Sequence, residues 1–183
     1  NIETDLSKRL DYRYIDLRNP KNLLVMKVLS TFVNSSRQFF VDDDLIEIFS
    51  PKLIATPSEG GGEDFAIPYF KRKAYLAQSP QFYKQMANTA GMGGVFEIGP
   101  VFRANPSHTT RHDTEFTSLD VEVSWLDDEE IRKFEERWLT HSIRAIKKKH
   151  GNEIKSILGI DIKIPKLPFP RIKMEKALKI AGI

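Results

Sequence analysis

Residues 94–125 read GVFEIGPVFRANPSHTTRHDTEFTSLDVEVSW. Apolar and polar residues alternate at both ends of this stretch, which is typical of strands with one buried face. The apolar positions are Val95, Phe96, Ile98, Val101 and Phe102 in the first half, and Phe116, Leu119, Val121, Val123 and Trp125 in the second. A polar loop of residues 105–114 joins the two halves, so the pattern predicts an antiparallel hairpin. The loop is longer than a tight hairpin needs, and long loops on rigid strands often carry binding residues.

Several side chains of this hairpin suit a phosphorylated, planar ligand. Arg103 leaves the first strand, Arg111 and His112 lie in the loop, and Glu115 and Phe116 open the second strand. A guanidinium binds phosphate oxygens as a fork, and an aromatic ring offers a stacking face. Taken as an arbitrary hairpin, the same residues would form a charged, solvated tip, and that alternative stays open on the pattern alone.

The segment FRANPSHTTRHDTEF resembles motif 2 of the class II aminoacyl-tRNA synthetases, in the form found in aspartyl and asparaginyl enzymes. That form runs Phe-Arg-Ala-Glu, a short loop, Arg-His, two residues and Glu-Phe. The ATP-binding residues that the resemblance implies are Arg103, Asn105, Arg111, His112, Glu115 and Phe116. Arg103 would be the catalytic residue that holds the α-phosphate, Arg111 and His112 would meet the terminal phosphates, and Phe116 would stack on adenine. Asn105 departs from the family, which usually has Glu there, so its ATP contact is left open.

Composition indicates one globular domain without disulfides. The chain has 183 residues, 40% of them hydrophobic and 29% charged, and a net charge of +3 that neither demands nor excludes nucleic acid. It has no cysteine, and its four histidines lack metal-site spacing, so no metal ligand is predicted. No apolar run has membrane-spanning length and no signal peptide is evident. We therefore expect a cytoplasmic protein with no membrane contact.

The first part of the chain predicts a linker, a long helix and a strand. Residues 1–18 resemble the linker that follows the anticodon-binding domain in these synthetases, and that domain itself is missing; residues 19–183 would begin the catalytic domain. Asn19 can cap a helix of roughly twenty residues, since apolar residues then recur at three and four. Residues 45–54 read as a strand at an edge or interface, because Pro51 cannot donate to a ladder. Helix, strand and proline resemble motif 1, which implies a homodimer through residues 19–54, with Pro51 in the interface.

The segment AYLAQSPQFYKQ, residues 74–85, carries the candidate amino-acid site. Two short strands flank residues 71–73, Ser79 then caps a helix with Pro80 in its first turn, and Gly91 ends that helix. The preceding glycine-rich loop, residues 55–64, resembles the flipping loop of the aspartyl enzymes. The resemblance implies that aspartate is held by Glu59, Gln78, Ser79, Gln81 and Lys84, with Lys84 on its side-chain carboxylate. Taken alone, Lys84 would be interpreted as a solvated surface lysine.

The last third of the chain is predicted as a charged helix and a less regular tail. Asp127 or Asp128 would cap the helix, and residues 147–149, three lysines, would suit its C-terminal end. Residues 151–164 show no clear period beyond a short strand at 162–164, and a new helix begins before Ile183.

We expect an α+β domain built on an antiparallel sheet flanked by helices, which is part of the class II catalytic fold with motifs 1 and 2 but without motif 3. The resemblance implies activation of L-aspartate with ATP and transfer to tRNA(Asp), with Mg²⁺ expected from ATP chemistry. Three alternatives stay open. They are an asparaginyl or non-discriminating synthetase, a paralogue that forms asparagine, and a binding fragment without activity.

Overall fold

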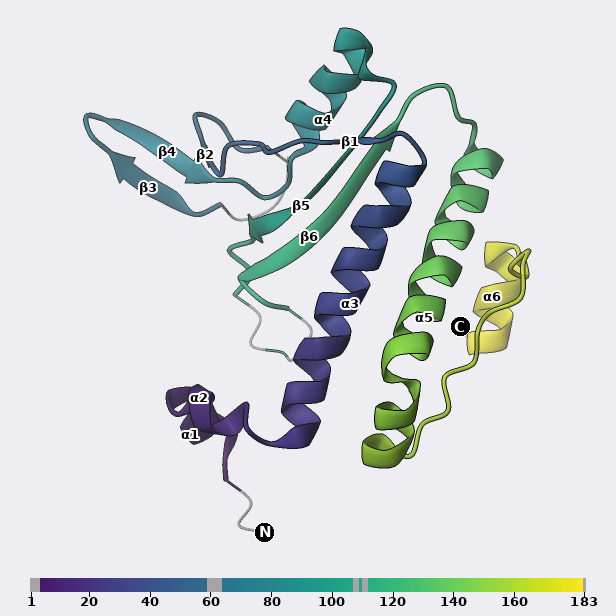
Figure 1. Cartoon of the computed structure of the whole chain (residues 1–183). Coiled ribbons are helices and arrows are strands. Elements are labelled where there is room, and N and C mark those ends of the chain that lie inside the picture. The colour runs from purple at the N-terminus through teal and green to yellow at the C-terminus, as the bar shows by residue number, and fades with distance from the viewer. Residues whose placement is uncertain (1–3, 59–63, 107–108, 110–111, 183) are drawn as a thin grey trace. The chain divides into compact units, whose positions relative to one another are not determined.

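The computed structural model describes residues 4–58, 64–106, 109 and 112–182. The chain divides into two compact units, one of Asn1–Phe39 with Asp127–Ile183 and one of Phe40–Leu126 (Figure 1). Each unit is described by itself below. Helices and two small sheets together confirm the α+β class, and no described helix is long and apolar enough to cross a membrane.

The larger ladder of the second unit is the hairpin of β5 (Gly94–Phe102) and β6 (Glu115–Val123). The two strands pair antiparallel from Gly94 opposite Val123 to Phe102 opposite Glu115, as the alternating pattern predicts. β1 (Ile46–Glu47) lies on the other side of β5 and runs parallel to it, so this sheet is mixed rather than purely antiparallel. A parallel neighbour requires a long crossover, and the second sheet and α4 supply it here.

One face of the hairpin is apolar and packs into the core of its unit. Phe96 and Val121 are opposite each other in the register, and Phe96 is fully buried. Its ring lies 5.1 Å from that of Phe40, centroid to centroid. Trp125 does not continue this face as expected, because β6 ends at Val123 and Trp125 is 96% exposed at a φ of 66°.

The prediction of one strand over residues 45–54 is wrong. Two short strands form instead, β1 and β2 (Leu53–Ile54), and each lies at the edge of a different sheet. Pro51 lies exposed between them, and because it has no backbone N–H to donate it disfavours one continuous strand.

The second sheet has the order β2–β4–β3. The hairpin of β3 (Ala66–Tyr69) and β4 (Arg72–Leu76) is confirmed, although its turn is at Phe70 and Lys71. α4 (Gln81–Ala87) follows, one residue later than predicted, and the Oγ of Ser79 still accepts from the Gln81 amide at 3.3 Å. A π-helical turn (Asn88–Met92) then passes through Gly91, whose φ of 90° is outside the helical region.

The first unit is organised by two long antiparallel helices, α3 (Pro20–Asp42), which belongs to it as far as Phe39, and α5 (Asp128–Leu158), and they lie side by side in Figure 1. The Oγ1 of Thr31 lies 2.8 Å from the Nε2 of His150, and the rings of Phe39 and Phe134 are 5.5 Å apart. The predicted caps hold at both N-termini. Asn19 accepts from the Lys21 amide, and Asp127 forms a capping box.

α5 extends beyond its predicted end. Residues 147–149 lie within the helix, which continues through Gly151 and ends at Leu158 before Gly159, whose φ is 70°. The buried side chains of His150 and Ile154 account for the extra turns, since a buried helix face outweighs the propensity of a single glycine. The predicted strand at residues 162–164 does not form.

Residues 5–18, expected as a linker, form two short helices, α1 (Leu6–Asp11) and α2 (Arg13–Asp16). Asp5 caps α1, and the carboxylate of Asp16 pairs with the guanidiniums of Arg9 and Arg13. The hydrogen bond from Arg9 is the largest of the effects that lower the pKa of Asp16. The helix expected near the C-terminus is α6 (Met174–Ala181).

An ion pair attaches the segment before α6 to α5. Arg171 pairs with Glu136, a residue of α5 that is 5% exposed, and reaches Glu129 at 3.4 Å. Burial by itself raises the pKa of the Glu136 carboxyl. Hydrogen bonds from Arg171 and from the backbone of Phe169, together with nearby positive charge, outweigh this effect, so the pKa is lowered.

The Glu136 pair predicts loss of stability in acid. Because the folded-state pKa is lowered, the pair stabilises the fold above the ordinary range of a glutamate pKa, and this contribution is lost as the pH falls through the lowered value. We expect Glu136→Gln to lower the free energy of unfolding at pH 7, and this difference from wild type to shrink in acid. Urea unfolding across pH measures it. Glu135→Gln, on an exposed residue of the same helix, is the control, and equal pH profiles for the two variants would contradict the prediction.

Candidate functional site

The hairpin of β5 and β6 has a polar face opposite its apolar one. Side chains two residues apart in a strand share a face, and directly opposed residues share it too. The Arg103 amide donates to the carbonyl of Thr114 at 2.9 Å, so the pairing continues one residue beyond β5. With the register of the hairpin, this assigns one face, called the polar face below, to Glu97, Arg103, Phe116, Ser118, Asp120 and Glu122, together with the buried Val95 and Val101.

Arg103 and Phe116, predicted from the sequence as phosphate and base contacts, lie together on the polar face. The guanidinium carbon of Arg103 is 5.4 Å from the centroid of the Phe116 ring, which is cation–π geometry. Glu115 pairs with Phe102, so the register assigns it to the opposite face, away from Arg103.

Asn105 and His112 are the two candidate loop residues that the structure describes. Asn105 is exposed, and its amide donates to the carbonyl of Arg103 at 2.8 Å. His112 is exposed and its Nδ1 lies 2.6 Å from the Oγ1 of Thr109. Arg111 lies outside the described residues. The structure therefore brings the Arg103 guanidinium and the Phe116 ring together, while Asn105 contacts the Arg103 backbone and the His112 ring contacts Thr109.

Lys84 is not a solvated surface lysine, because its side chain is only 12% exposed. Its Nζ lies 3.3 Å from Asp120 Oδ1 and 3.5 Å from Glu122 Oε2, both on β6. Asp120 also accepts a hydrogen bond from the Oγ of Ser118 at 2.5 Å. The sequence analysis missed Asp120 and Glu122, although the alternation of polar and apolar residues from Ser118 to Val123 is the signal that could have found them.

Gln78 and Ser79 are buried where β4 leads into α4. The Oγ of Ser58 accepts from the backbone amides of both residues, at 3.2 Å and 3.3 Å. Gln81 follows half-buried at the start of α4. Ser58, which the sequence analysis did not single out, directly precedes Glu59, and Glu59 itself lies outside the described residues.

Backbone hydrogen bonds join this segment to the hairpin. The Ala77 amide donates to the carbonyl of Lys52, and the Phe102 amide donates to the carbonyl of Ala77, both at 2.9 Å. The end of β4 therefore lies beside the end of β5, and Gln78, Lys84, Arg103 and Phe116 belong to one region of the second unit. Phe116 and Asp120 are four residues apart in β6, about 13 Å along a strand.

The charges of this region fit a ligand with separate anionic and cationic groups. Arg103 offers a cation beside an aromatic ring, Lys84 offers a second cation, and Asp120 and Glu122 offer acceptors for an ammonium group. Among the described residues, no group of three or more His, Asp or Glu side chains is placed to hold a metal ion. Mg²⁺ stays an expectation from ATP chemistry.

Comparison with known proteins gives a consistent relationship. The family described as tRNA synthetases class II (D, K and N) matches residues 5–183. The chain is 43% identical over 182 residues to the aspartate–tRNA(Asp) ligase of Thermococcus kodakarensis and 41% identical over 181 residues to the aspartate–tRNA(Asp/Asn) ligase of Methanococcus aeolicus. Each alignment covers 99% of this chain and 41% of the relative.

A solved structure supports the same relationship at the level of the fold. It is the asparaginyl-tRNA synthetase of Pyrococcus horikoshii complexed with asparaginyl-adenylate, with a TM-score of 0.88 and 34% identity. The match covers 98% of this chain and 42% of that one. The chain thus spans about two fifths of the length of these proteins.

Proposed function

Because this chain belongs to the class II tRNA synthetases of the D, K and N group, we propose that it activates L-aspartate with ATP and transfers the aspartyl group to tRNA(Asp). The observation that carries the choice of amino acid is Lys84, a largely buried cation whose two carboxylate partners lie on the same face of the hairpin as Arg103 and Phe116. We further propose that residues 19–183 are the first part of the catalytic domain and residues 1–18 a linker to an anticodon-binding domain.

In this proposal Lys84 binds the side-chain carboxylate of aspartate. Aspartate and asparagine have nearly the same shape, so a pocket that prefers aspartate needs a fixed cation. Asp120, which faces Lys84 at 3.3 Å, would accept the substrate ammonium group. Gln78, Ser79, Gln81 and Glu59 would complete the amino-acid site. Burial of Gln78 and Ser79 supports this role, since a dry site strengthens ionic contacts.

Arg103 and Phe116 would bind ATP, with adenine on the ring and the α-phosphate on the guanidinium. Their cation–π arrangement supports this pairing. Asn105, Arg111, His112 and Glu115 stay proposed ATP contacts. The α-carboxylate of aspartate attacks the α-phosphorus and pyrophosphate leaves; a hydroxyl of the 3′-terminal adenosine of tRNA then attacks the aspartyl carbonyl and AMP leaves. The protein supplies position and charge stabilisation, and needs no covalent intermediate.

A second candidate differs only in its tRNA. The relative from Methanococcus aeolicus is named for both tRNA(Asp) and tRNA(Asn), at an identity close to that of the tRNA(Asp) enzyme. Lys84 bears on the amino acid and not on the tRNA. Charging of purified tRNA(Asn) with aspartate by the intact protein would favour this candidate, and charging of tRNA(Asp) alone would exclude it.

We also propose a cytoplasmic homodimer that forms through residues 19–54. Val25, Met26 and Leu29 of α3 are 56%, 44% and 52% exposed, on the side of the helix away from the buried Leu24. Three large apolar side chains on one exposed helix face support an interface. In the second unit, the exposed Pro51 and the 81% exposed Phe49 support it separately.

Removing the Arg103 side chain tests the ATP site. We expect Arg103→Ala in the intact protein to lower aspartate-dependent exchange of pyrophosphate into ATP by roughly a hundredfold, equivalent to about 3 kcal/mol of transition-state stabilisation. The melting temperature should change little, because Arg103 is exposed. Arg72→Ala, on an exposed arginine of β4, is the control. Near-normal exchange in a folded Arg103→Ala protein would refute the assignment.

Removing the Lys84 charge tests the amino acid. Lys84→Met keeps most of the volume, and loss of one charge-assisted contact is worth about 2–3 kcal/mol, roughly a hundredfold in aspartate KM. The KM for ATP should stay within about threefold. Pyrophosphate exchange at varied aspartate and asparagine measures this, with Lys73→Met as the control. An unchanged aspartate KM and unchanged preference over asparagine would leave the amino-acid assignment to resemblance alone.

The dimer proposal predicts a change of oligomeric state. In a two-fold interface each substitution acts twice, so one buried charge is costly. We expect the intact protein to sediment as a dimer at micromolar concentration and Leu29→Glu to shift it toward monomer. Asn34→Glu, at an exposed polar position of the same helix, should leave the dimer intact. A monomeric wild-type protein would contradict the proposal.

A further inference from the structure

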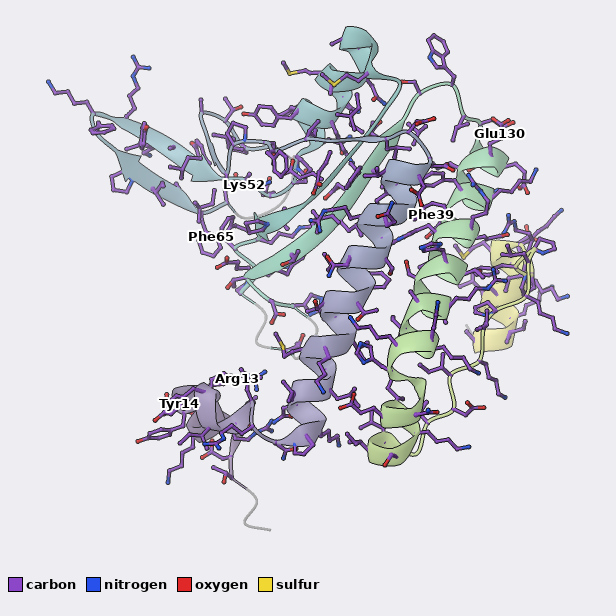
Figure 2. All side chains as sticks on the ribbon, in the orientation of Figure 1. Arg13, Tyr14, Phe39, Lys52, Phe65 and Glu130 are labelled. Atoms are coloured by element: carbon purple, nitrogen blue, oxygen red, sulfur yellow. The ribbon has the colours of Figure 1, made fainter. Side chains whose placement is uncertain are left out.

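The carboxylate of Glu97 is buried in the middle of β5, on the polar face, and Lys52 neutralises it. Glu97 is 5% exposed. Lys52, labelled in Figure 2, lies in the segment between β1 and β2, and its ammonium pairs with Glu97 Oε1. The Ser50 amide donates to Glu97 Oε2 at 3.2 Å, and Lys52 Nζ lies 3.1 Å from the Ser50 Oγ. Both carboxylate oxygens are therefore satisfied.

Lys52 connects two parts of the proposed site at once. Its side chain holds β5 through Glu97, while its backbone carbonyl accepts from the Ala77 amide. Ala77 in turn accepts from the Phe102 amide, directly before Arg103. Ala77 also directly precedes Gln78. Lys52 thus fixes the end of residues 74–85, called the amino-acid segment below, against β5, the strand that leads into Arg103.

The pair also protects the charge balance of the polar face. Glu97 is directly opposite Asp120 in the register, and like charges in that arrangement repel. Lys52 neutralises Glu97, and Lys84 pairs with Asp120. Without Lys52, the unpaired carboxylate of Glu97 would compete with Asp120 for the ammonium group of Lys84.

Gly99 leaves the space that this pair occupies. A Cβ at Gly99 would lie 3.3 Å from Glu97 Oε1 and 3.6 Å from Lys52 Cε. The first distance is shorter than ordinary van der Waals contact, so an alanine would press on the carboxylate.

We infer that Lys52 and Glu97 are positioning residues that hold the amino-acid segment at a fixed position relative to β5 and Arg103. The inference rests on the proposed function and concerns residues that touch neither substrate. The contacts of Lys84 with Asp120 and of Arg103 with Phe116 do not include either residue of the pair, so removal of both charges should chiefly loosen the distance between these two contacts. Loss of the pair should then lower kcat more than it raises either KM.

The test uses the intact protein and the double variant Lys52→Met/Glu97→Gln, which removes both charges and leaves no buried unpaired ion. We expect kcat per titrated active site in aspartate-dependent pyrophosphate exchange to fall at least about tenfold, since small misplacements of reacting groups cost up to roughly a hundredfold. Aspartate and ATP KM values should change less than about threefold. Lys52→Arg keeps the cation and should retain most of the activity. The control is Lys71→Met/Glu135→Gln, at exposed positions.

A second readout does not depend on activity. Hydrogen exchange of the Ala77 and Phe102 amides should be faster in the double variant than in wild type, while amides of α5 stay unchanged. Unchanged exchange at these two amides, or a wild-type kcat per active site, would overturn the inference. If the wild-type protein lacks aspartate-dependent activity, the proposed function fails, and the two amides still decide whether the pair fixes the register.

Discussion

The antiparallel pairing of β5 with β6 is the constraint on which the rest of the second unit depends. It gives each side chain one of two faces, so Phe96 enters the core beside Val121, while Glu97, Asp120 and Glu122 lie on the other face. Carboxylates crowded in this way require cations, and Lys52 and Lys84 arrive from separate segments to supply them. The amino-acid segment thus contacts the hairpin through the ion pair of Lys84 with Asp120 and through the hydrogen bond between Ala77 and Phe102.

This arrangement explains why one small sheet can serve two chemically different halves of a proposed ligand. Arg103 and Phe116 lie toward the loop end of the hairpin, where Arg103 is exposed and Phe116 half-buried. Lys84 and Asp120 lie further along the same face, where exposure falls. The separation between Phe116 and Asp120 is set by the fixed rise per residue of β6.

Much of this was predictable where local signals agree. Alternation predicted the β5–β6 hairpin, and Asn19 and Asp127 predicted the starts of α3 and α5. The failures occur where tertiary contacts outweigh local ones. Gly151 does not end α5, because His150 and Ile154 are buried around it, and Pro51 divides one expected strand between two sheets. The partners of Lys84 were missed because the sequence does not show which strand faces α4.

β6 is the last strand in its sheet order, with a partner on one side only among the described residues. Alternate residues of this nine-residue strand therefore direct their backbone donors and acceptors away from β5, which is the usual template for strand addition. The free edge of β6 could therefore pair with another β-strand, either from the same chain or from a second copy of it. Self-association of the chain could then occur in two ways, by backbone pairing at β6 or by apolar contact at α3. The two ways would differ in symmetry and in concentration dependence.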